Sequence, residues 1–334
     1  MAYKANMDDI KKLRTMTGAG LGDVKKALEE AEGDFDKAKD LLRERGLAIA
    51  AKRSDRETSN GCVLVKKVSG FAAMVAVKCE TDFVANGADF IAMTQSILDA
   101  AIEARCKNLD EVKALTLANG ETAEAVVTQR SGITGEKMEL DGYNFIEGDN
   151  VDVYDHMGKH TLCTMVQLNK NNEDAAHKVA MQVAAMKPVA LNAESIDPQI
   201  LEEEYKTAIE KSKLEQVQKF VDMQLKKAGI NPAHVDSEDH IESNTTKGWI
   251  TKEQADEARK IIAEAKAEGE AQLKMPMIEG IARGRVEKFK KESCLVDQEF
   301  QFGDGDKATV QQWLAQQDKE LQICDFKRFT LVAE

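Results

Sequence analysis

The residues best suited to act on another molecule stand in one short connection, Thr81-Asp82-Phe83-Val84. This connection follows a strand-like run, Met74–Cys79, and precedes a helix-like run that begins near Asp89. A carboxylate and an aromatic ring are therefore neighbours at a bend of the chain. Either the bend begins with a helix cap and Phe83 packs into its own core, or both side chains are offered to another molecule.

Histidines and acidic pairs are the other groups that could do chemistry. His156 and His160 have the i, i+4 spacing of helical metal ligands, but Gly158 between them argues for a turn, so solvated turn histidines are the simpler interpretation. Acidic pairs such as Asp8-Asp9 are most simply helix-start charges. The sequence contains no GxxxxGK[ST], GxGxxG, GxSxG or HExxH motif. We therefore expect a protein that is not an enzyme and that needs no cofactor or metal.

Bulk composition restricts the class of partner. The chain has 334 residues, a net charge of −13 and only 5% aromatic residues. An acidic surface does not bind phosphate backbones over a broad face, so we expect a protein or small-molecule partner and no direct contact with nucleic acid. No apolar run approaches the roughly 20 residues of a membrane span, and no apolar leader is present. Six scattered cysteines are typical of a reducing compartment, so we expect a cytoplasmic protein without membrane contact.

The elements that must position the 81–84 connection follow from apolar spacing. Residues 1–53 predict three short helices, the third ending at Gly46, and a polar linker follows over 54–60. Residues 61–145 begin with two strands joined at Ser69-Gly70 and continue into a helix. Residues 146–198 repeat that plan. We infer an α+β fold whose core has two related subdomains with antiparallel strands.

The rest of the chain predicts an inserted helical element. Residues 199–275 are rich in Glu, Lys, Gln and Ala, and apolar residues recur at a 3-4 spacing in two arms, which predicts a helical coiled-coil hairpin. Thr251 with Gln254 fits a capping box at the second arm. Residues 276–334 are expected to complete the second subdomain, with a helix, a strand over Cys294–Phe300, a helix over Thr309–Gln316 and a strand over Leu321–Val332.

Motifs at several places along the chain carry a resemblance to a known family. They are Leu13–Leu28 with its Thr17-Gly18-Ala19-Gly20 break, Thr81–Asn86, Tyr154-Asp155-His156-x-Gly158, Ala180–Pro188 and Glu279–Phe289. In this order they resemble the bacterial translation elongation factor Ts family, and only the 200–275 region is poorly matched. The resemblance implies a ubiquitin-associated-like domain at residues 1–53.

The resemblance also implies a function and a mechanism. The protein would bind elongation factor Tu, both GDP-bound and nucleotide-free, and promote exchange of GDP for GTP without chemistry of its own. Asp82 and Phe83, with Thr81 and Val84 beside them, would insert near the partner's Mg²⁺ site and displace the ion.

Four further positions are implied to contact the partner. Arg14, Leu21 and Gly22 match partner-contacting positions of the N-terminal domain. Gln182 stands where many family members have a partner-contacting histidine, and its amide can form hydrogen bonds but cannot become charged.

A second function stays open beside this one. The three-helix module and the coiled coil could serve a nucleotide-indifferent adaptor that only holds proteins together. An adaptor would bind GDP-loaded and nucleotide-free partner equally, whereas an exchange factor would prefer the nucleotide-free form.

Overall fold

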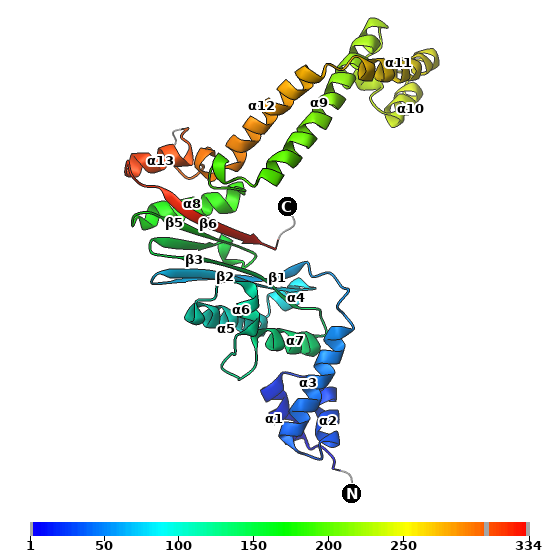
Figure 1. Ribbon diagram of the computed structural model, residues 1–334. Coiled ribbons are helices and arrows are strands. Elements are labelled where there is room, and N and C mark those ends of the chain that lie inside the picture. The colour runs from blue at the N-terminus through cyan, green and yellow to red at the C-terminus, as the bar shows by residue number, and fades with distance from the viewer. Residues whose placement is uncertain (1–2, 304–306, 332–334) are drawn as a thin grey trace. The chain divides into compact units, whose positions relative to one another are not determined.

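A computed structural model describes residues 3–303 and 307–331 of the chain (Figure 1). Helices and two small antiparallel sheets make up the structure, so the predicted α+β class is confirmed. The chain divides into two compact units, Met1–Pro188 with Gln298–Glu334, and Val189–Asp297. Among the described residues, no helix is both long and apolar enough to cross a membrane.

Three helices form the N-terminal part of the first unit. They are α1 (Met7–Thr17), α2 (Leu21–Glu30) and α3 (Phe35–Ala51). Leu13, Val24 and Leu28 are fully buried and form the centre of a small core between them. The helical spacing in the sequence predicted an inner face for the second helix with Leu21, Val24 and Leu28, of which Leu21 is instead 47% exposed.

The prediction that the third helix ends at Gly46 is wrong. Gly46 lies inside α3, which continues to Ala51 and packs on α7 (Ala123–Thr134). A Cβ atom added to Gly132 of α7 would lie 2.2 Å from the Gly46 Cα. The glycine therefore allows two helices to approach closely instead of ending one of them, which is the alternative role of a helical glycine.

The first sheet has the strand order β1-β2-β3, all antiparallel. Its strands are β1 (Asn60–Val68), β2 (Phe71–Cys79) and β3 (Glu139–Glu147). The central strand β2 is buried on both faces, which explains its uninterrupted apolar run. Besides α7, α5 (Ala88–Ala104) and α6 (Leu109–Ala114) pack on one face of this sheet. Polar residues and Gly142 interrupt the alternation of β3, so the sequence did not indicate that strand.

The second sheet has the order β4-β5-β6 and is also antiparallel. Its strands are β4 (Val151–Asp155), β5 (Leu162–Leu168) and β6 (Ile323–Thr330). The helix α8 (Glu173–Met186) packs on it, and the Thr164 hydroxyl donates to the Ala180 carbonyl at 2.9 Å. The inner faces of the two sheets meet around Met74, Met165 and Phe329.

The C-terminal elements differ in part from the prediction. Cys294–Phe300 is not a strand, because Leu295–Asp297 forms a short 3-10 turn and only isolated bridges flank it. The helix α13 (Val310–Gln317) and the strand β6 lie close to their predicted ranges. The last residue of the predicted strand, Val332, lies outside the described residues.

The second unit contains the long helices. They are α9 (Pro198–Lys227), α10 (Glu238–Thr246), α11 (Lys252–Ala271) and α12 (Met275–Ser293). The later part of α9 packs on α11 through Val221 and Ala258, and the Thr251–Gln254 capping box is present.

The helix α12 belongs to this second unit and not to the C-terminal subdomain, where residues 276–334 were expected. It packs along α9 (Figure 1), and Arg285 of α12 is 2.6 Å from Glu215 of α9. Because α9 has 30 residues and α11 only 20, α11 leaves part of α9 uncovered, and α12 packs there.

Candidate functional site

Phe83 projects from α4 (Asp82–Ala85), a single helical turn directly after β2. Its side chain is 88% exposed, whereas Ala85 is buried and Val84 packs against the core of the first sheet. Asp82 is exposed beside the ring. The alternative in which Phe83 packs into its own core is therefore wrong, although the cap that it assumed is present, because the Thr81 hydroxyl accepts from the Val84 N–H at 3.3 Å.

The connection before α4 is tied to the segment between α7 and β3. The backbone N–H of Thr81 donates to Glu136 at 3.1 Å, and the Thr81 hydroxyl donates to the same carboxylate at 2.6 Å. In return, the backbone N–H of Lys137 donates to Glu80 at 2.6 Å. That bond and the Arg56 guanidinium hold the pKa of Glu80 below its ordinary value. The sequence did not indicate Glu136, because it is far from Thr81 along the chain.

The N-terminal positions lie around the turn between α1 and α2. Arg14 and Gly22 are exposed, and the Leu21 side chain is 47% exposed. Around Gly22 the space is open, since a Cβ atom there would meet nothing within 4 Å. All three residues belong to the same compact unit as Phe83.

Gln182 on α8 is fully buried, contrary to the expectation that it contacts a partner directly. Its amide nitrogen donates to the Glu299 carbonyl at 3.1 Å, and its amide oxygen accepts from the Gln301 N–H at 3.0 Å. Both ends of the amide are thus used to join α8 to the segment before α13. In this structure a partner could reach Gln182 only if that segment moved.

The histidine pair forms no metal site. His160 is paired with Asp155, and the His156 ring is 3.1 Å from the Tyr154 hydroxyl. Met157 between them has a positive φ of 58°, so this segment is a turn. Within residues 3–303 and 307–331, no cluster of three His, Cys, Asp or Glu side chains could hold a metal ion.

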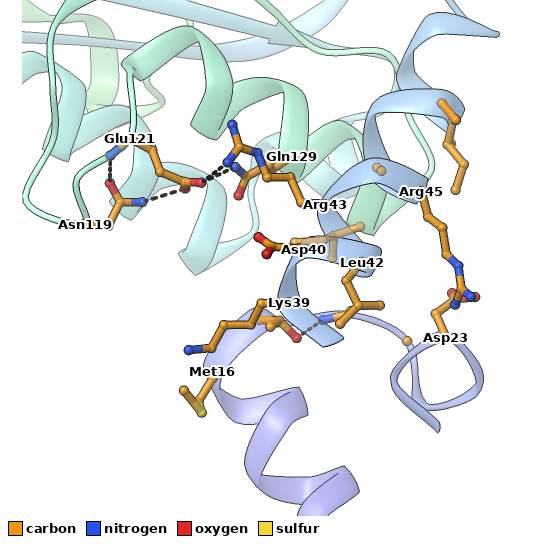
Figure 2. Close-up of a pocket in the computed structure, with 18 residues that line it drawn as sticks. Met16, Asp23, Lys39, Asp40, Leu42, Arg43, Arg45, Asn119, Glu121 and Gln129 are labelled. Carbon is orange, nitrogen blue, oxygen red and sulfur yellow. Dashed lines mark hydrogen bonds and ion pairs between the residues drawn. The ribbon is translucent and has the colours of Figure 1, made fainter. Parts of the chain in front are cut away.

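A cavity of about 670 Å³ lies between the N-terminal helices and the α7 region (Figure 2). Glu121 accepts from Gln129 at 2.6 Å and from Asn119 at 3.1 Å, and it is 3.9 Å from Arg43. No residue of the 81–84 connection lines it. These four side chains on one wall therefore pair with one another, and we assign no ligand to the cavity.

Comparison with known proteins gives one consistent result. The family model described as Elongation factor TS matches residues 80–333. Elongation factor Ts of Phocaeicola vulgatus is 58% identical over 328 residues, which cover 98% of this chain and 99% of that protein. The same factor of Parabacteroides distasonis is 57% identical with the same coverage. That of Porphyromonas gingivalis is 38% identical over 329 residues, covering 98% of both chains.

Proposed function

Because this chain belongs to the elongation factor Ts family of translation factors, we propose that it binds elongation factor Tu carrying GDP and promotes exchange of GDP for GTP. The observation that carries the proposal is the Phe83 ring, 88% exposed beside the carboxylate of Asp82. When a partner covers a large apolar side chain that is exposed to water, burial of its surface favours binding. The exchange takes place in the cytoplasm, where translation occurs.

The mechanism is mechanical and involves no covalent step. Asp82 and Phe83, supported by Thr81 and Val84, insert near the Mg²⁺ site of the partner and displace the ion. Mg²⁺ demands near-ideal octahedral geometry. A small shift of an element that carries its ligands therefore weakens the binding of both the ion and the nucleotide phosphates to the partner. By linkage, nucleotide weakens the binding of the exchange factor by the same factor.

The magnitudes indicate that Phe83 does not act alone. A 10⁴-fold loss of nucleotide affinity needs on the order of 5.5 kcal/mol of differential binding. Complete burial of one phenylalanine side chain supplies roughly 1.5–3 kcal/mol. Contacts at Arg14, Leu21 and Gly22, on helices that we take to be a ubiquitin-associated-like domain, would supply part of the remainder. Gln182 is buried and is given no direct contact with the partner, because its amide holds the segment before α13 against α8.

Release of fluorescent GDP from elongation factor Tu tests the proposal. The wild-type protein should accelerate release, and replacement of both side chains, Asp82→Ala with Phe83→Ala, should slow the accelerated rate by about 30-fold, as expected for roughly 2 kcal/mol of lost ring burial. Leu214→Ala is the matched control. Leu214 is likewise a large exposed apolar residue, with 70% of its surface accessible, but it lies on α9 in the other unit. A wild-type protein that leaves the release rate unchanged would refute the proposal.

The affinities for GDP-loaded and nucleotide-free elongation factor Tu distinguish an exchange factor from an adaptor protein. An exchange factor should bind nucleotide-free elongation factor Tu far more tightly than the GDP-loaded form, because the two ligands are coupled. Equal affinities, measured by calorimetry, would instead indicate the nucleotide-indifferent adaptor.

A further inference from the structure

The direction of Phe83 cannot be set by packing of its own ring. The ring is 88% exposed, and α4 is only four residues long. A single helical turn is unstable in isolation, because its hydrogen bonds do not offset the ordering of its backbone. The backbone on both sides of Phe83 must therefore be held by other parts of the molecule.

On the C-terminal side, packing holds the backbone. Ala85 is buried, and Val84 packs on the core of the first sheet. The Asn86 side chain also donates to the Asp82 carbonyl at 2.8 Å, which closes the turn.

On the N-terminal side, the Glu136 carboxylate holds the backbone. One of its oxygens accepts from the Thr81 N–H and the other from the Thr81 hydroxyl. That same hydroxyl oxygen accepts from the Val84 N–H, so the carboxylate, the cap and the helical turn form one chain of hydrogen bonds. Because the Thr81 side chain is exposed, hydrogen bonds and not packing hold it. The Cys79 thiol donates to the Thr81 carbonyl at 3.2 Å and the Asn60 amide to the Glu80 carbonyl at 2.8 Å, but the Thr81 N–H and hydroxyl donate to Glu136.

Glu136 is itself fixed in place. It directly follows the left-handed Gly135 that ends α7. The hydroxyl of Ser131, which is 2% exposed, donates to the Glu136 carbonyl, and the Glu136 N–H donates to the Thr134 hydroxyl at 3.3 Å. The backbone of Glu136 is therefore held at the end of α7, and from there its carboxylate reaches the two donors of Thr81.

We propose that Glu136 is a positioning residue for nucleotide exchange, which holds Thr81 and thereby fixes the direction in which Phe83 meets the partner. The inference rests on the proposed function and adds to it the residue that pre-orders the inserting turn. When only a fraction of molecules carries the turn in the competent arrangement, the apparent affinity of the Phe83 contact is reduced to that fraction of its intrinsic value.

Exchange kinetics with substituted proteins test the positioning role. Glu136→Ala removes both acceptors of Thr81 and should lower kcat about tenfold, because hydrogen bonds to a charged group are lost. KM should change little, since Arg14 and Leu21 are untouched. Glu136→Gln keeps one acceptor oxygen and should recover part of the loss. The control is Glu139→Ala, since Glu139 also accepts from a threonine hydroxyl, at 2.8 Å, but that of Thr58 before β1.

A double-substitution experiment separates positioning from general damage. In a Phe83→Ala background, Glu136→Ala should lower kcat by less than about twofold, because there is no ring left to position. A loss of the same size in both backgrounds, or no loss in the wild-type background, would overturn the proposal.

Amide hydrogen exchange of the free protein gives a readout that does not need elongation factor Tu. Glu136→Ala should accelerate exchange at the Thr81 and Val84 amides by about tenfold or more, whereas Glu139→Ala should leave both unchanged. Unchanged protection in Glu136→Ala would refute the positioning role. If the wild-type protein does not accelerate GDP release from elongation factor Tu, the proposed function is refuted instead. The amide measurement would still decide whether Glu136 orders the turn.

Discussion

Phe83 and Phe90 lie on consecutive helices, yet the first ring is 88% exposed and the second is fully buried. Phe90 lies on α5, whose inner face covers the first sheet. Phe83 lies on a turn whose anchors are its neighbours Val84 and Ala85, so its own ring is free to bind another molecule. Residue type alone does not separate these two roles, because either ring is apolar enough to be buried.

Cysteine burial gives a prediction at this same scale. Burial raises the pKa of Cys62 and of Cys79 to about 12, against an ordinary value of 9.0. Between these values the unfolded chain loses thiol protons that the folded chain keeps, so this contribution is complete below about pH 9 and is lost as the pH rises toward 12. We expect the free energy of unfolding, measured with urea, to be lower at about pH 10 than at about pH 8. Above pH 9, each of the two thiols should lower it by about 1.4 kcal/mol per pH unit.

Substitution of single thiols identifies the source of this effect. Cys62→Ala should reduce the decrease of stability with pH relative to the wild type. Cys324→Ala should not, because Cys324 is the exposed cysteine of the six. An unchanged pH slope in Cys62→Ala would contradict the assignment.

At the scale of elements, the packing of the two sheets depends on a missing side chain. Gly142 on β3 is buried, and a Cβ atom there would lie 2.3 Å from the ring of Phe329 on β6 and 2.8 Å from the Cβ of Ala76 on β2. The ring of Phe329 thus occupies the space that a larger residue at position 142 would fill. This explains why a glycine occupies position 142 of β3.

Gly142→Ala should therefore destabilise the protein. Overpacking between the sheets costs about 1–3 kcal/mol, which a urea unfolding curve would resolve. Gly284→Ala on α12 is the matched control, since a Cβ atom there meets nothing within 4 Å. In an open helical position alanine should stabilise by up to about 1 kcal/mol. Equal effects of the two substitutions would show that the close approach to Phe329 does not matter.

At the scale of the whole molecule, the residues assigned to exchange all belong to one compact unit. Arg14, Leu21 and the 81–84 connection lie in the unit formed by Met1–Pro188 and Gln298–Glu334. The two segments of this unit are held together next to the junction, because the Gln298 side chain donates to the Met186 carbonyl at 3.1 Å. The second unit is thus an insertion between two chain positions that lie close together.

Excision of the insertion should leave exchange intact. We expect a protein in which Val189–Asp297 is replaced by a short glycine-serine linker to fold cooperatively, since the first unit has its own core. Its rate of GDP release should stay within about threefold of the wild-type rate, because the proposed contacts are kept. Circular dichroism establishes folding, and fluorescent GDP release measures activity. A folded but inactive variant would show that the helical unit takes part in exchange.

The sequence by itself determined the features that depend on nearby residues. It predicted the three N-terminal helices, the strand pairs before α5 and before α8, and the capping box at Thr251, because spacing and capping are local properties. It also placed Asp82 and Phe83 at a bend, and its motifs agree with the family match. Only the tertiary structure decided that Phe83 is exposed, that Gln182 is buried, that Gly46 is a helix contact and that Glu136 supports Thr81. Each of these depends on a segment distant in sequence that covers, contacts or leaves open the residue, and a pattern within one segment carries no information about that neighbour.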